Sequence, residues 1–332
     1  MMTNNAKPFL KWAGGKTQLL SQFEEYYPIE LKENKIKTYV EPFLGGGAVF
    51  FSLQSKENCN FENIILNDIN KELIITYKVI QQKVDELIEC LSDLEQRYLR
   101  AEMEEKEKMY YSQREAFNIE KTSIDYNNYS DDWIQHAAKM IFLNKTCFNG
   151  LYRENKKGGF NVPFGKRKNV TICDESNLRE VNKALTGVIL TCGDFEEITN
   201  DYEIKNLIGK DTFVYIDPPY RPLNATSNFN DYSKEPFNDK SQIRLINWTK
   251  KLHDRGSLFM YSNSDPTNIQ EKDDFFEVEF EKAFHGDRSI KINRVQASRV
   301  INSKGTGRGK IRELLITNYE VNTSKRAVGI ID

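Results

Sequence analysis

Short apolar runs alternate along this chain with longer segments in which apolar residues recur every three or four positions. The short runs predict buried β-strands, because they are rich in β-branched and aromatic residues and end abruptly at polar, glycine or proline residues. They cover residues 38–40, 64–66, 188–191, 213–216, 257–262, 295–301 and 312–317. The helical spacing predicts a first helix that ends near Phe23, one continuous helix over 73–98, and further helices over 133–143 and around 242–253. This alternation predicts an α/β sheet with helices on both faces.

A largely helical stretch separates the second predicted strand from the rest of the sheet. It ends in residues 149–165, where Gly158 and Gly159 lie between β-prone residues and predict a hairpin with a basic tip. A hairpin that carries arginine and apolar side chains can enter the DNA major groove. We therefore expect a discontinuous domain formed by residues 1–76 and 171–332, with an inserted domain at 77–170.

The charge is unevenly distributed, although the net charge is only −2. Eight basic residues and no acid occur between Arg288 and Arg312, and six basic residues with the single acid Glu154 occur between Arg153 and Lys168. Such runs form either solvated basic surfaces or contacts to a polyanion, and local fields matter more than the total charge for the second. The composition therefore leaves a nucleic-acid partner open.

The chain lacks the features of membrane and secreted proteins. No apolar run approaches a membrane span, and the N-terminus has no apolar segment of the kind found in signal peptides. The five cysteines are odd in number and form no Cys-x-x-Cys pair, so we expect neither disulfides nor a metal site. A cytoplasmic location follows as an expectation.

Residues 213–220 carry the clearest chemical signal. A buried strand runs into Asp217, two prolines and Tyr220, and proline stiffens the chain that follows the strand. Asp217 and the carbonyl of Pro218 can accept both protons of an –NH₂ group, and Tyr220 offers a face on which a planar ring can stack. The alternative is a strand followed by a structural turn in which Asp217 caps nearby backbone.

A second signal is the glycine turn at 45–47 between a strand and a helix, followed about twenty residues later by Asp68. This order is typical of a nucleoside-binding unit, in which the acid holds the ribose hydroxyls. Phe50 stands where a dinucleotide site needs a small residue, which argues against NAD or FAD; helix capping is the alternative role for Asp68. The segment Gly15-Lys16-Thr17 is not a phosphate loop, because Leu10 replaces the required glycine.

Six ordered blocks together resemble the Dam/DpnII-type DNA adenine methyltransferases. They are Phe9-Leu10-Lys11-Trp12-Ala13-Gly14-Gly15-Lys16, Glu41-Pro42-Phe43-Leu44-Gly45-Gly46-Gly47, Asn67-Asp68-Ile69-Asn70, Asn149-Gly150-Leu151-Tyr152-Arg153, Phe160-Asn161-Val162-Pro163-Phe164-Gly165 and Asp217-Pro218-Pro219-Tyr220. The resemblance implies a Rossmann-like sheet that binds S-adenosylmethionine in the discontinuous domain and a target-recognition domain in the insert.

The resemblance also implies roles for individual residues. Asp217, Pro218 and Tyr220 would be catalytic, and Asp217 also borders the cofactor. The implied contacts to S-adenosylmethionine come from Trp12, Lys16, Phe43, Gly45, Gly47, Asp68, Asp194 and Phe195. The implied reaction moves a methyl group directly to the N6 amine of adenine in double-stranded DNA after base flipping.

The segment 149–165 resembles the recognition hairpin of GATC-reading members. The implied DNA contacts come from Lys11, Leu151, Arg153, Pro163, Arg167 and Lys168. Leu151 and Pro163 could instead pack within the hairpin, and some relatives carry an aromatic residue at the position of Arg167. A restriction endonuclease is an expected functional partner. A protein-glutamine methyltransferase or a catalytically silent DNA-binding module are the alternatives.

Overall fold

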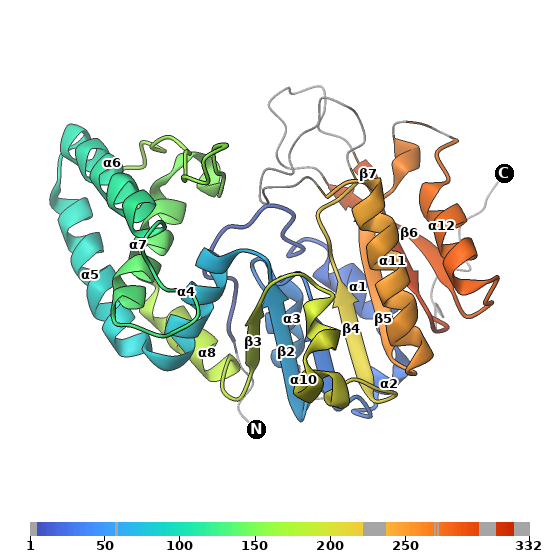
Figure 1. Ribbon diagram of the computed structural model, residues 1–332. Coiled ribbons are helices and arrows are strands. Elements are labelled where there is room, and N and C mark those ends of the chain that lie inside the picture. The colour runs from blue at the N-terminus through green and yellow to red at the C-terminus, as the bar shows by residue number, and fades with distance from the viewer. Residues whose placement is uncertain are drawn as a thin grey trace.

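The computed structural model describes residues 5–56, 59–221, 237–268, 270, 272–298 and 310–321. These residues form one seven-stranded sheet in the order β3-β2-β1-β4-β5-β7-β6 (Figure 1). The strands are β1 (Thr38–Glu41), β2 (Asn63–Asp68), β3 (Ile189–Cys192), β4 (Thr212–Ile216), β5 (Leu258–Ser264), β6 (Lys291–Ser298) and β7 (Lys310–Thr317). The strands from β1 to β5 are parallel, whereas β7 pairs antiparallel with both β5 and β6.

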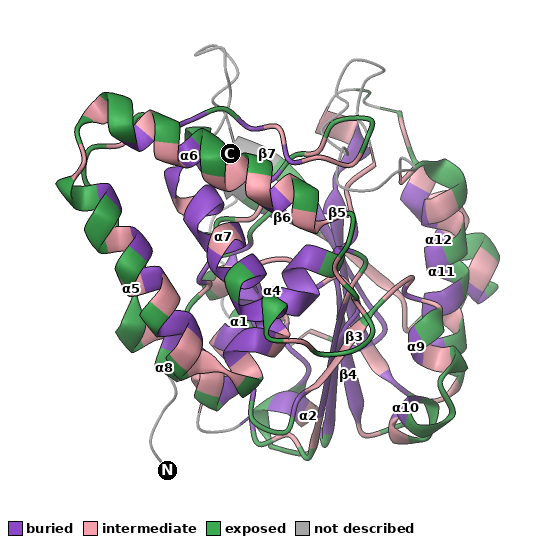
Figure 2. Cartoon of the chain, turned by 60° about the vertical axis from the view of Figure 1, so that its left-hand side comes forward, coloured by how far each residue is buried: buried purple, intermediate pink, exposed green. Residues whose placement is uncertain are grey.

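Each central strand buries side chains on both faces, because successive residues point to opposite sides of the sheet. Tyr39 and Phe213 belong to one apolar cluster, and their chain neighbours Val40 and Val214 belong to the other. Figure 2 shows the central strands as almost entirely buried. A parallel strand that is covered on both faces has a nearly continuous run of apolar residues, and for this reason the sequence reveals it.

Helices cover both faces of the sheet, as expected, so the predicted α/β fold is confirmed. The first cluster includes residues of α1 (Leu20–Tyr26), α2 (Ile29–Lys32), α3 (Ala48–Gln54), α4 (Lys71–Gln82), α5 (Val84–Arg100), α6 (Met103–Glu120), α7 (Asp132–Thr146) and α8 (Glu175–Ala184). The second includes residues of α9 (Glu197–Asn200), α10 (Tyr202–Leu207), α11 (Asp239–Asp254) and α12 (Phe275–Phe284). Short 3-10 turns occupy Phe148–Gly150 and Pro266–Asn268. In Figure 1, α5, α6 and α7 extend to one side of the sheet.

The prediction of one continuous helix over 73–98 is wrong. Lys83 has φ −141° and ψ 43°, which are not helical, and it separates α4 from α5. The apolar spacing continues across this break through Ile80 and Val84, so the pattern alone does not reveal it. Asp85 and Glu86 lie in the first turn of α5, where negative charge stabilises a helix N-terminus.

The predicted hairpin is more irregular than a two-stranded ladder. Two isolated antiparallel bridges, Cys147 with Phe164 and Glu154 with Phe160, hold the segment together. The chain reverses where the N–H of Gly158 donates to the carbonyl of Asn155 at 2.8 Å. The predicted polar loop at 224–234 and the cationic loop at 304–309 lie outside the described residues.

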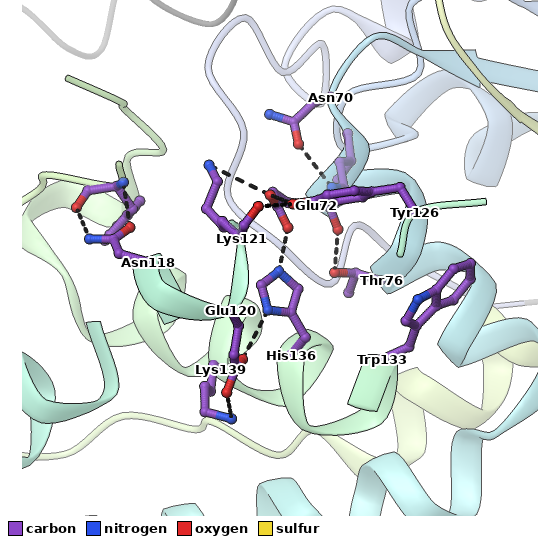
Figure 3. Close-up of polar contacts among 12 residues, drawn as sticks. Asn70, Glu72, Thr76, Asn118, Glu120, Lys121, Tyr126, Trp133, His136 and Lys139 are labelled. Carbon is purple, nitrogen blue, oxygen red and sulfur yellow. Dashed lines mark hydrogen bonds and ion pairs between the residues drawn. The ribbon is translucent and has the colours of Figure 1, made fainter. Parts of the chain in front are cut away.

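A buried polar cluster joins α4, α6 and α7 (Figure 3). The imidazole of His136 is fully buried and lies between two carboxylates, with Nε2 against Glu72 and Nδ1 3.0 Å from Glu120. The Phe117 ring stacks on it with 4.4 Å between the ring centroids. Burial would lower the pKa of His136, but hydrogen bonds to Glu120 and Glu72 raise it above its ordinary value. Only imidazolium donates from both nitrogens, so this geometry fits the protonated form.

Candidate active site

The candidate site lies at the carboxyl edge of the parallel strands. Glu41 is the last residue of β1, Asp68 is the last residue of β2, and Asp217 directly follows β4. The pairing of β1 with both β2 and β4 brings these three strand ends together. Ligands of open α/β sheets bind in the crevice beyond this edge.

Asp217 is paired with a lysine from the N-terminal segment. The Nζ atom of Lys16 lies 2.8 Å from Oδ2 of Asp217, and the same ammonium group donates to the carbonyl of Gly14 at 2.7 Å. The buried Oδ1 of Asp217 has no hydrogen-bond partner among the described residues. Burial raises the pKa of Asp217 to about 6, although the charge of Lys16 opposes the shift.

The ring of Tyr220 is held at its hydroxyl by two neighbouring strands. The hydroxyl donates to Oε2 of Glu313 on β7 at 2.7 Å and lies 3.0 Å from Oγ of Ser262 on β5. The Nζ atom of Lys16 lies 4.7 Å from the ring centroid. A nitrogen donor therefore sits above an aromatic face and against the Asp217 carboxylate, which is the arrangement expected for an amine substrate.

Asp68 fixes the glycine turn. Its Oδ2 accepts from the N–H of Gly45 at 2.9 Å, and its Oδ1 accepts from the N–H of Asn70 at 2.8 Å. The side chain of Asn70, and not of Asp68, caps α4 by accepting from the N–H of Leu73 at 2.9 Å. Burial raises the pKa of Asp68, against these backbone hydrogen bonds. The capping alternative for Asp68 is therefore wrong.

The glycines of this turn leave room for aromatic side chains. Gly45 has φ +49°, and a Cβ atom there would lie 2.8 Å from Cδ1 of Trp12. Gly47 has φ +69°, and a Cβ atom there would lie 2.8 Å from the hydroxyl oxygen of Tyr77. Any larger residue would collide with these side chains, so this packing requires glycine at both positions.

Phe43, Asp194 and Phe195 lie on the other side of the same edge. The Phe43 ring contacts that of Phe195, with 5.7 Å between centroids. The carboxylate of Asp194 pairs with Arg244 at 2.6 Å. Phe195 is only 2% exposed and packs on Trp248, so its ring is part of the core while Phe43 and Asp194 remain partly accessible.

The structure brings Lys11 against the predicted recognition segment. Asn144 of α7 accepts from the N–H of Lys11 and donates to its carbonyl, both at 2.9 Å. A Cβ atom on Gly150 would lie 2.5 Å from Cδ of Lys11, so the two segments are in contact.

The other predicted DNA contacts differ in exposure. Arg153 is exposed, and its Nε donates to Oδ1 of Asn161 at 2.8 Å. Pro163 and Lys168 are also exposed, whereas Leu151 and Arg167 are half-buried. The Leu151 side chain packs against the first apolar cluster, so part of its surface serves the core.

Two acidic residues of the site were missed by the sequence interpretation. Burial raises the pKa of Glu41 to about 8, although Tyr39 donates to its carboxylate at 2.7 Å. Glu41 directly follows a predicted strand, which was a usable signal. Glu313 lies inside the apolar β7, where a lone acid is unusual, but nothing in the sequence connects it to Tyr220.

Within the described residues, no group of three or more histidine, cysteine or acidic side chains could hold a metal ion. No helix among them is long and apolar enough to cross a membrane.

The parallel strands β1 to β5, the glycine turn and the acidic corner together have the arrangement of an S-adenosylmethionine-dependent methyltransferase that acts on an amino group. Residues 12–299 match the family described as D12 class N6 adenine-specific DNA methyltransferases, and the chain belongs to this family. It is an adenine-specific DNA methyltransferase, and S-adenosylmethionine is its methyl donor.

Named relatives agree with this family. The chain is 49% identical to the type II methyltransferase M.MjaIII of Methanocaldococcus jannaschii over 94% of this chain and 99% of that protein. It is 33% identical to the type II methyltransferase M1.LlaDCHI of Lactococcus lactis over 95% of this chain and 96% of that protein. It is 32% identical to the DNA adenine methylase of Haemophilus influenzae over 93% of this chain and 92% of that protein.

Proposed function

We propose that this enzyme methylates adenine within GATC in duplex DNA after flipping the base out of the helix. The observation that carries the proposal is the corner formed by Asp217 and Tyr220, which already holds the nitrogen donor of Lys16 above the ring. An adenine in a duplex cannot reach such a buried carboxylate, so the base must leave the stack. Stacking on Tyr220 would recover roughly 1–3 kcal/mol of the cost.

The proposed catalysis is positioning by hydrogen bonds. Asp217 and the carbonyl of Pro218 accept the two N–H bonds of the adenine amine, so that the nitrogen lone pair becomes available. S-adenosylmethionine supplies an electrophilic methyl group on a sulfonium. As the new bond to nitrogen forms, positive charge grows next to the Asp217 carboxylate and strengthens its hydrogen bond. S-adenosylhomocysteine would be the other product, and the methylated nitrogen would release its extra proton to water.

The cofactor pocket of this proposal lies around the glycine turn. Asp68 would hold the ribose hydroxyls, since each of its oxygens retains a lone pair beyond the backbone bond that it already accepts. Trp12, Lys16, Gly45 and Gly47 would border the methionine part. Phe43, Asp194 and Phe195 would border the adenine part.

Sequence recognition is assigned to the insert at 77–170, although α4 spans the boundary at 76/77. In this proposal Arg153 and Lys11 bond guanines, Leu151 and Pro163 make apolar contacts, and Arg167 and Lys168 contact DNA nearby. The exposure of Arg153 and the contact of Lys11 with Gly150 support this assignment. The type II relatives support pairing with a restriction endonuclease.

Transfer of label from methyl-labelled S-adenosylmethionine tests the function directly. The substrates are a GATC duplex, the two duplexes in which one G·C pair of GATC is changed and both adenines are kept, and a duplex already methylated at N6 of both adenines. Label on the first duplex alone is expected. Efficient transfer to another sequence would show that the chemistry is right and the recognition sequence wrong. Label on protein glutamine instead of DNA would contradict the proposal entirely.

Replacing Arg153 by alanine should relax discrimination at one base pair. The expected loss is about 1–3 kcal/mol in the ratio of kcat/KM between GATC and the duplex changed at that pair, because a bidentate contact to guanine is removed. Lys156→Ala is the matched control, since it removes a charge from the same exposed tip. An equal loss on all duplexes would make Arg153 a phosphate contact.

Methyl transfer should depend on the ionisation of Asp217. The pKa of this carboxyl is raised to about 6, and only the ionised form accepts both from Lys16 and from an amine. We expect kcat/KM to increase about tenfold per pH unit below about pH 6 and to level off above it. Initial rates between about pH 5 and 8, with circular dichroism to confirm folding, measure this. A flat profile would show that the carboxylate form is not required.

A further inference from the structure

Two aromatic rings join the glycine turn to the recognition segment. Trp12 packs against Gly45, as the 2.8 Å approach to a Cβ atom there indicates. The Tyr152 ring stacks on Trp12 with 5.3 Å between centroids and an interplanar angle of 25°. Tyr152 immediately precedes Arg153 in the chain. The stack therefore bridges the proposed cofactor pocket and the proposed reader of guanine.

The far end of Tyr152 is anchored by charged groups. Its hydroxyl donates to Oε1 of Glu154 at 2.5 Å and accepts from Nζ of Lys121 at 3.1 Å. Lys121 also forms an ion pair with Glu154. Tyr152 is 2% exposed, whereas Arg153 is exposed and donates to Asn161. The backbone of this segment thus places one side chain in the core and the next one outside.

A second connection runs from the same lysine back to the glycine turn. The Nζ atom of Lys121 lies 3.6 Å from Oε1 of Glu72, in the first turn of α4 (Figure 3). The cap of α4 is Asn70, whose N–H donates to Asp68. Asp68 in turn holds the N–H of Gly45. The contacts form a closed circuit, so a displacement of the glycine turn meets resistance from the recognition segment by two routes.

We propose that Tyr152 is a positioning residue that couples occupancy of the cofactor pocket to reading of the DNA sequence. The proposal rests on the roles proposed above for Trp12 and Arg153. A ligand that orders the glycine turn fixes Trp12, which fixes Tyr152 and thereby the backbone that carries Arg153. Because coupling between two sites is reciprocal, the correct DNA sequence must strengthen cofactor binding by the same factor.

The test measures the affinity of S-adenosylhomocysteine by calorimetry, with and without the duplex that the wild-type enzyme methylates. The ratio of the two affinities is the coupling factor. Tyr152→Leu removes the stack and should reduce the factor by about three- to tenfold, the range that aromatic pairs contribute. Tyr152→Phe keeps the ring but loses the anchor, so its coupling factor should fall between those of wild type and Tyr152→Leu.

Phe61→Leu is the matched control. Phe61 stacks on Tyr39 with the same 5.3 Å and 25°, but it precedes β2 and so lies at the opposite edge of the sheet. This variant should leave the coupling factor unchanged. A merely structural role for Tyr152 would weaken binding equally with and without DNA, which leaves the ratio at its wild-type value.

The outcomes separate this inference from the proposed function. A wild-type coupling factor of one, or wild-type coupling in both Tyr152 variants, overturns the inference. If Tyr152→Leu does not fold, the test rests on Tyr152→Phe. A coupling factor of Tyr152→Phe equal to that of Phe61→Leu would then overturn the inference. Failure to methylate GATC would contradict the proposed sequence alone, because the coupling is measured on whichever duplex is methylated.

Discussion

Replacing Asp217 by asparagine is expected to reduce methyl transfer by about 10²–10³-fold or more and, at the same time, to stabilise the fold. Asparagine has nearly the same shape but no negative charge to place beside the amine as positive charge develops. Removing one preorganised partner of a developing charge costs about this much in other enzymes. Calorimetric binding of DNA and of S-adenosylhomocysteine should remain largely intact.

The gain in stability follows from the raised pKa of Asp217. Burial raises it from 3.8 to about 6, so at neutral pH the folded protein holds a charge that the unfolded chain would carry at lower cost. The difference corresponds to about 3 kcal/mol in the free energy of unfolding. The folded state binds more protons between these two values, so the stability of the wild-type protein falls as pH rises through this window.

Urea unfolding of the two proteins measures both effects. The asparagine variant should be more stable by about 3 kcal/mol above about pH 7, and the difference should vanish near pH 4. Asp239→Asn is a suitable control, because Asp239 is an exposed acid paired with Arg221. An asparagine variant that retains near-normal turnover, or that is less stable at neutral pH, would contradict the role given to Asp217.

The largest loss of stability is expected from His136→Leu. The leucine leaves the carboxylates of Glu72 and Glu120 without the imidazolium between them, and breaking a buried charge pair costs about 3–5 kcal/mol. Lys121 and Lys139 still reach these carboxylates, so we expect the lower end of that range. His253→Leu is the control: His253 pairs with Asp287 at 3.1 Å near the surface, where such pairs contribute about 1 kcal/mol or less.

The stability that His136 contributes depends on pH. The pKa of His136 is raised, so its contribution is complete below pH 6.5 and is lost as pH rises through the folded-state value. Burial would raise the pKa of Glu72 and of Glu120, but hydrogen bonds with His136 together with the charges of His136 and a neighbouring lysine outweigh it, so both pKa values are lowered. Their contribution is present above pH 4.5 and is lost on acidification. The difference between wild type and variant in urea unfolding should therefore be largest between these limits, and a difference that does not vary with pH would show that His136 is uncharged.

Much of the sheet could be predicted from the sequence because parallel strands buried on both faces produce continuous apolar runs. The break at Lys83 could not, since Val84 continues the spacing set by Ile80. Helix α6 was not predicted, because its buried residues are Lys106, Tyr110 and Phe117, of which only two are apolar. A local backbone feature decides the first case and too few buried apolar residues decide the second, and hydrophobic periodicity reports neither.

The same limit applies to the candidate site. Asp217 and the glycine turn were recognisable because their chemistry lies within a few consecutive residues. The pairing of Lys16 with Asp217 and of Glu313 with Tyr220 joins residues that are far apart in the chain. The strand order brings Glu313 of β7 to Tyr220, and Lys16 reaches Asp217 from the segment before α1; no local pattern contains either arrangement.

The position of β7 has a consequence for protein synthesis. This strand lies between β5 and β6 in the sheet, although it follows both in the chain. Until β7 has been synthesised, β5 has one unpaired edge and β6 has no strand with which to pair. Glu313 arrives with β7, so the hydroxyl of Tyr220 gains this hydrogen bond only when the segment has left the ribosome. A nascent chain should therefore be unable to methylate DNA before β7 has emerged.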